Sequence, residues 1–240
     1  AAAFTPIGIS FNDYTEGALD GQDDWTAPAG VNVIAGGLQY TAADGGTFDG
    51  GSQALEMDAS TASPINDWTL RGLTEAPTDT FWISYYANVA DNGTTDPTEL
   101  FVRHAGWSLF SAIKVSDDTF EVVGETATGL GLTHGETYLV VLRANMEGGT
   151  ITSVDGWLNP VRGDLDTPLV SATGLSVDPA TLTGFELRSQ KTYSVVDHLT
   201  MGLTWEEIVP EGLPAFGALG LSIEDYAEGA LDGQDGWTAP

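Results

Sequence analysis

The stretch TFWISYYANVA, residues 80–90, is apolar at nearly every position and gives the strongest strand signal in the chain. Because polar residues do not alternate through it, we expect a central strand that is buried on both faces of a sheet. Further along, ETYLVVLRANM (136–146) and TITSVDGWLNP (150–160) flank the short turn EGG (147–149). This pattern of two apolar segments around a glycine-rich turn predicts a β-hairpin.

Short apolar runs separated by turn residues continue through the rest of the chain. The 30 glycines and 11 prolines punctuate it about every eight to twelve residues, which suits strands joined by turns. A hydrophobic content of 42% is enough for a core, and no amphipathic helix is evident. One large all-β domain is as plausible on these grounds as two small domains. Residues 161–183 are predicted as a polar loop and residues 205–210 as a single helical turn.

The opening of the chain is predicted to be a strand followed by a loop. GISFNDY (8–14) alternates apolar and polar residues, and EGALDGQDDWTAP (16–28) is rich in turn residues. Leu19 and Trp25 are the expected apolar anchors of this loop.

The charge of the chain excludes some classes of partner. Thirty-five acidic residues against seven basic ones give a net charge of −28, which repels phosphate backbones and anionic membranes. No run reaches the ~18–20 apolar residues that a membrane-spanning helix needs. We therefore expect no nucleic-acid binding and no membrane insertion. The acidic surface favours divalent cations, and the chain has no cysteine for a disulfide scaffold or a thiolate metal site.

The opening loop occurs twice. Residues 13–28 read DYTEGALDGQDDWTAP and residues 225–240 read DYAEGALDGQDGWTAP, so 14 of 16 positions match at an offset of 212 residues. We interpret residues 1–212 as one module and residues 213–240 as the first strand and loop of the next repeat. The repeated segment either begins that module or completes a sheet in a neighbouring copy by strand addition. Tyr226, Leu231 and Trp237 are the expected assembly residues.

Two motifs resemble a known family. WLNP at residues 157–160 ends a strand, and DHLTMGLTW at residues 197–205 has the form of a closing strand. Together with the opening DYTEGALDGQDDW, they resemble the concanavalin A-like, laminin-G-related jelly roll of secreted bacterial surface proteins. The resemblance covers residues 8–210. It implies an all-β, two-sheet antiparallel jelly-roll sandwich with about six or seven strands in each sheet, one sheet being concave, and an extracellular, cell-surface location.

Calcium in a structural role is the cofactor that the sequence suggests, and the alternative is that the carboxylates below belong to a solvated acidic surface. In related jelly rolls an ion often ties the first strand to the last, and the resemblance therefore implies Asp197 together with Asp13 or nearby carbonyls. A second candidate is a loop whose oxygen atoms could converge on a hard cation. Its ligands would be Asp91, Asn92, Asp96 and Glu99.

Aromatic side chains could bind a glycan if they are exposed on the concave face. The eligible residues are Trp82, Tyr86, Trp107 and Trp157.

Catalysis is not expected. Glucanases of this superfamily carry three acidic residues in E-x-D-x-x-E, whereas this chain has Glu56, Asp58 and then Thr61.

The sequence therefore favours a structural or adhesive repeat module of a long extracellular filament or giant surface protein. Such modules would associate head-to-tail with neighbouring copies through the repeated strand. The alternative is a carbohydrate-binding module that recognises surface glycans.

Overall fold

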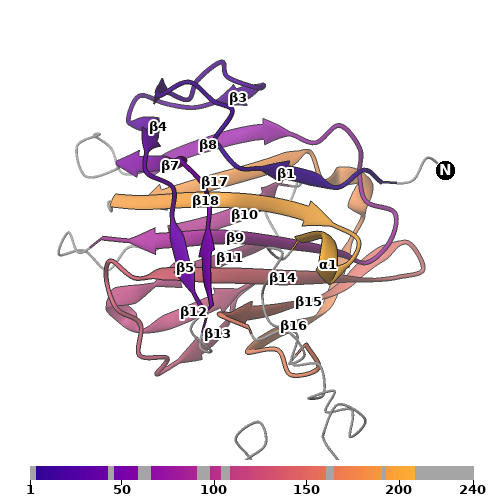
Figure 1. The fold of residues 1–240 in the computed structure, drawn as a ribbon. Helices are drawn as coiled ribbons and strands as arrows, with labels where there is room; N and C mark the ends of the chain where they lie inside the picture. Colours follow the sequence, from indigo (N-terminus) through magenta and orange to yellow (C-terminus); the bar gives the residue numbers. More distant parts are fainter. Residues whose placement is uncertain are drawn as a thin grey trace, which may run out of the picture.

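The computed structural model describes residues 4–42, 46–58, 66–90, 98–103, 109–160, 165–190 and 193–208, with the backbone alone for 66–70, 98–103 and 190. These residues form two antiparallel sheets that pack face to face (Figure 1). The prediction of a two-sheet antiparallel jelly-roll sandwich is therefore confirmed. The predicted second copy at residues 213–240 lies outside the described residues.

The larger sheet has nine strands in the described part of the chain, and β9 lies near its middle. Its order is β16 (Val170–Val177), β15 (Thr150–Leu158), β14 (Thr137–Glu147), β9 (Phe81–Val89), β18 (Tyr193–Gly202), β7 (Gln53–Asp58), β4 (Val31–Ala35) and β2 (Gly17–Ala18). The ninth strand, β1 (Ile7–Ile9), pairs with the end of β18.

The second sheet has seven strands within the same ranges. Its order is β13 (Glu125–Thr128), β12 (Thr119–Val122), β11 (Phe110–Lys114), β10 (Thr98–Arg103), β17 (Gly184–Gln190), β8 (Asn66–Gly72) and β3 (Trp25–Thr26). Five smaller elements complete the described structure. They are the hairpin strands β5 (Gln39–Thr41) and β6 (Thr47–Asp49), the 3₁₀ turns η1 (Val115–Asp117) and η2 (Pro179–Thr181), and the helical turn α1 (Trp205–Ile208).

The strongest sequence signals are confirmed. β9 is buried at all but one position, and β14 and β15 form the predicted hairpin around residues 148 and 149. The helical turn is also found, as α1. Among the residues that the structure describes, no helix is long and apolar enough to cross a membrane.

Two predictions about local structure are wrong. Residues 161–183 include β16, which pairs with β15 at the edge of the larger sheet. Val170, Ala172 and Val177 are buried there, but the glycine and serine residues between them hide the pattern. The opening strand is also shorter than predicted, because β1 ends at Ile9 and Phe11 turns the backbone with a φ of +53°.

The main core lies between the two sheets. β9 contributes Phe81, Ile83 and Tyr85, and the facing sheet contributes Phe120 and Phe185, all buried. The sheets approach closely at Gly156 on β15, where a Cβ atom would lie 2.5 Å from Val122 Cγ2 and 3.1 Å from the Phe120 ring. Any other residue at this position would have to displace the side chains of Val122 and Phe120.

We expect Gly156→Ala to lower the free energy of unfolding by about 1–3 kcal/mol, because an added methyl group overpacks the core. Chemical denaturation measures this change. Gly8→Ala is the matched control, since a Cβ atom at Gly8 would meet only Thr200 Cγ2 at 3.9 Å. Equal effects of the two substitutions would contradict the close approach of the sheets at Gly156.

Candidate functional site

β9 and β14 present a second apolar layer on the outer face of the nine-stranded sheet. Along β9, Trp82 and Tyr86 belong to this layer, whereas their neighbours face the main core. Leu139 and Val141 of β14 and Trp157 of β15 extend it across the sheet. The layer contains three of the aromatic residues that the sequence suggested for glycan binding.

The β5–β6 hairpin and α1 cover this layer (Figure 1). The Tyr40 ring of the hairpin stacks on Tyr86 with centroids 5.9 Å apart, and Trp205 of α1 meets Trp82 edge-on at 5.8 Å. The carbonyl of Ile208 accepts hydrogen bonds from the hydroxyls of Ser84 and Thr200, which fixes α1 on the sheet.

Trp82, Tyr86 and Trp157 therefore do not form an exposed aromatic platform. Trp82, Tyr86 and Trp157 are only 8%, 1% and 3% exposed, because the hairpin, α1 and Arg143 lie over them. Trp107 lies outside the described residues.

Arg143 of β14 shields the indoles of this layer at the edge nearest β16. Its guanidinium carbon lies 5.2 Å from the centre of Trp82 and 5.3 Å from that of Trp157, while the two indoles stack at 5.6 Å. Nη2 and Nε of Arg143 also donate to Asp155 Oδ2 at 2.8 and 3.2 Å. The cation is thus held between a carboxylate and two aromatic faces.

Asp155 is the centre of a polar network on the same face. Besides Arg143, it accepts hydrogen bonds from Asn145 at 2.7 Å and from Ser171 at 2.6 Å. Burial alone would raise the pKa of Asp155, but the hydrogen bonds from Ser171, Arg143 and Asn145 outweigh it, so the pKa lies below its ordinary value. Sequence reasoning missed this pair, although the hairpin register places Arg143 opposite Asp155.

Asp197 lies beneath the hairpin and is fully buried. Its two carboxylate oxygens accept backbone hydrogen bonds from Leu38 at 3.0 Å and from His198 at 2.7 Å. Burial raises the pKa of Asp197 to about 7, and the charge of Asp49 adds to the effect, while the two hydrogen bonds oppose it. A Cβ atom at residue 50 would overlap this carboxylate, so only glycine permits the contact.

The structure brings no metal ligands together at the first suggested calcium site. Asp13 is exposed, whereas Asp197 is buried with both oxygens already accepting hydrogen bonds. Within the described ranges, no three His, Asp or Glu side chains gather where they could hold a metal ion. At the second suggested site, residues 91–97 and the side chain of Glu99 lie outside the described structure. The predicted assembly residues also lie outside it; they are Tyr226, Leu231 and Trp237. Calcium binding stays a prediction.

The opening loop forms an open cleft of about 520 Å³. It is lined by Gly8, Ile9, Ser10, Asp13, Tyr14, Gln22 and Asp23. The two predicted anchors, Leu19 and Trp25, are buried beneath the loop.

Hydrogen bonds within the loop fix the walls of this cleft. The Tyr14 hydroxyl donates to Asp23 Oδ2 at 2.7 Å and accepts from Trp25 Nε1 at 3.3 Å. Gln22 Nε2 donates to two loop carbonyls, and its Oε1 accepts from the Thr15 amide at 2.7 Å. Asp23 also pairs with Arg71 Nη2 at 2.8 Å. Burial, with the hydrogen bond to Asp23, raises the pKa of Tyr14 to about 12, so its hydroxyl remains a donor at neutral pH.

Asn12 joins the loop to the turn before β7. Its Nδ2 donates to the Gly50 carbonyl at 3.0 Å, and its Oδ1 accepts from the amides of Ser52 at 2.6 Å and Gln53 at 3.0 Å. Sequence reasoning missed Asn12, since these partners lie about 40 residues away and no local pattern marks them.

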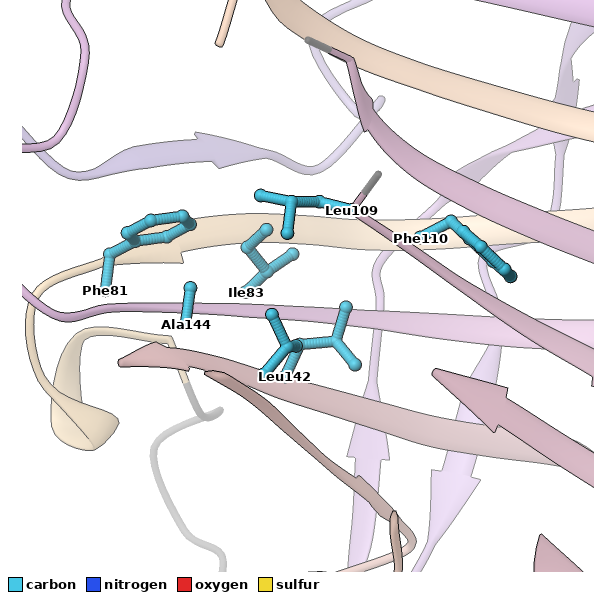
Figure 2. Close-up of a pocket in the computed structure, with 7 residues that line it drawn as sticks. Phe81, Ile83, Leu109, Phe110, Leu142 and Ala144 are labelled. Carbon is cyan, nitrogen blue, oxygen red and sulfur yellow. The ribbon is translucent and has the colours of Figure 1, made fainter. Parts of the chain in front are cut away.

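A second cavity, in the described part of the chain, is apolar and lies between strands of the two sheets (Figure 2). It is lined by Phe81, Ile83, Leu109, Phe110, Leu142, Ala144 and Val154. Its volume of about 20 Å³ is that of a single water molecule, so it cannot hold a sugar ring.

Glu56 and Asp58 share one face of β7, as their spacing predicts. Glu56 Oε1 accepts a hydrogen bond from the Tyr193 hydroxyl at 2.6 Å, which gives it a structural partner. Thr61 lies outside the described residues.

No protein-family model and no curated protein matches the sequence. Among solved structures, the chain is similar to the carbohydrate-binding module CBM66 from Bacillus subtilis, with 13% identity, a TM-score of 0.42 and coverage of 75% of this chain and 96% of that one. It is also similar to the cellulose-induced protein Cip1, with 14% identity, a TM-score of 0.47 and coverage of 82% and 97%. A third similar structure is lectin II from Ulex europaeus, with 11% identity, a TM-score of 0.45 and coverage of 83% of this chain and 98% of that one.

We expect the stability that Asp197 contributes to fall as the pH rises. The pKa of Asp197 is about 7 in the folded state and 3.8 ordinarily, so the folded state binds the proton more tightly than the unfolded chain does. Between pH 4 and pH 7 a rise in pH therefore favours unfolding. Relative to Asp197→Asn, the wild type should lose up to about 4 kcal/mol of unfolding free energy between pH 4 and pH 8. Denaturant titrations at a series of pH values measure the difference.

Asp155→Asn is the control, because its folded pKa is lowered and its contribution is therefore lost on acidification. A difference between wild type and Asp197→Asn that does not change with pH would show that Asp197 is ionised in the folded state throughout this range.

Proposed function

We propose that this module binds a glycan without transforming it, and that the cleft of the opening loop is the binding surface. The observation that carries the proposal is an open, polar cleft of about 520 Å³, within the usual range of ~300–1,000 Å³ for small-molecule sites. A volume of this size accommodates one or two sugar rings.

The polar groups of the cleft suit hydroxyl donors. Gln22 is occupied by the loop backbone and the Tyr14 hydroxyl by Asp23, so these side chains shape the site. The carboxylates of Asp13 and Asp23 are exposed, Asp23 with 53% of its side chain accessible, and can accept further hydrogen bonds. Adjacent hydroxyls of a sugar are donors that a carboxylate can bind.

Two features favour a neutral glycan. The net charge of −28 repels anionic sugars from the whole surface, and the exposed cleft groups are themselves acidic. The hydrogen bonds within the loop hold the cleft in shape before a ligand arrives, which limits the entropy lost on binding.

A structural or adhesive repeat module of an extracellular, cell-surface protein is the second candidate. The observation that favours it is the recurrence of residues 13–28 at 225–240. The two functions are compatible, because a repeated glycan-binding module is itself adhesive.

We expect screening against neutral oligosaccharides to identify a ligand, and Asp13→Asn to weaken its binding about tenfold or more. The loss of a charge-assisted hydrogen bond corresponds to about 1.5–3 kcal/mol. Isothermal titration calorimetry, with and without calcium, measures the affinity.

Asp166→Asn is the matched control, since Asp166 is exposed and does not line the cleft. Wild-type affinity in Asp13→Asn, or the absence of binding to any neutral glycan, would reject the cleft as a glycan site.

A further inference from the structure

Residues 4–28 bridge the two sheets at one edge of the sandwich. β1 pairs with β18 and β2 with β4 in the larger sheet, whereas β3 pairs with β8 in the smaller one. The segment also contributes five buried side chains to the main core. They are Phe4, Ile9, Phe11, Leu19 and Trp25. The rest of the sandwich therefore presents an apolar surface that this segment must cover.

The C-terminal repeat preserves every one of these core positions. At an offset of 212 residues, the five positions are again large and apolar. They are Phe216, Leu221, Ile223, Leu231 and Trp237. The polar side chains that line the cleft are also identical in the repeat. Ser10, Asp13, Tyr14, Gln22 and Asp23 correspond to Ser222, Asp225, Tyr226, Gln234 and Asp235.

The backbone requirements of the loop are preserved as well. Gly17 and Gly21 have φ values of +115° and +80°, and glycines stand at both corresponding positions, 229 and 233. Asp24 has a φ of +62°, and residue 236, one of the two differences between the copies in this stretch, is glycine. Glycine adopts this conformation without the steric cost that aspartate carries. The repeat is thus at least as suited to the loop conformation as the first copy.

Two positions make the first copy the better occupant of its own site. Asn12 bonds to Gly50, Ser52 and Gln53, and residue 224 of the repeat is a glutamate. Phe11 has a φ of +53°, where the β-branched Ile223 of the repeat is strained. A free C-terminal segment should therefore not displace residues 4–28 from an intact sandwich.

We infer that residues 216–240 are a donor segment for a second copy of this chain. They bind the surface that residues 4–28 cover, when that copy's own segment is weakened or absent, and so link two sandwiches head to tail. The inference goes beyond glycan binding and does not depend on it. The partner is a second copy because residues 216–240 carry a large apolar residue at each of the five positions that are buried against this surface.

Substitutions of Trp25 and Trp237 in the 240-residue chain test the inference. Wild type and Trp237→Ala should be monomers with the same Tm. Trp25→Ala should form concentration-dependent oligomers as the intact Trp237 segment of one copy fills the weakened site of another. The double variant should be monomeric, with a Tm about 10 °C below that of Trp25→Ala. Light scattering after size exclusion, and thermal unfolding, give these quantities at about 0.5 M salt, where the repulsion between acidic copies is screened.

Phe120→Ala is the matched control. It removes a buried ring from β12, outside the segment, and should destabilise the chain to the same extent whether or not Trp237 is present. If Trp25→Ala proves too unstable to study, Leu19→Ala with Leu231→Ala gives the same cycle with a smaller cavity. Independent, additive effects of the two copies, with every variant monomeric, would overturn the inference.

Discussion

The structure depends on the burial of β9 and β14 on both faces. One face packs on the seven-stranded sheet through residues such as Phe81 and Tyr85, and the other packs under the β5–β6 hairpin and α1. Burial of aromatic side chains on both sides contributes more than any single polar contact in the molecule, because each fully buried large side chain is worth about 1.5–3 kcal/mol. The polar groups are arranged around this apolar layer, as Asp155 and Arg143 at its edge illustrate.

The sequence was sufficient to predict the elements whose signals are local. An unbroken apolar run identifies β9, and two apolar segments around a glycine turn identify the β14–β15 hairpin. The sequence did not predict that the β5–β6 hairpin and α1 cover the outer face of the larger sheet. The alternation of apolar and polar residues cannot tell which side of a doubly buried strand faces solvent. The stacked rings of Tyr40 and Tyr86 belong to residues 46 positions apart, and no local sequence pattern predicts that they meet. β16 was missed because its core-facing residues are small or separated by glycine and serine.

The candidate site was likewise predicted only in part. The sequence suggested Asp13 as a calcium ligand and Leu19 and Trp25 as anchors of the opening loop; Asp13 lines the cleft, and the two anchors are buried. Which of its polar side chains face the solvent could not be predicted, since that depends on which of them the loop uses internally, as it uses Gln22. Asp197 was suggested only as a calcium ligand, on the family resemblance. Its carboxylate serves the packing of the hairpin through Leu38 and His198.

The pairing of β1 with β18 determines how the module responds to tension. Ile7 lies opposite Met201 and Ile9 opposite Leu199, so the beginning of β1 and the end of β18 meet at the same end of the ladder. Once α1 is released from the sheet, force applied at Ile7 and at the end of β18 loads the hydrogen bonds of this short ladder one after another, as in a zipper. Strands that are sheared along their length share the load among all their bonds at once. In a chain under tension, β1 would therefore detach from β18 before the two sheets separate.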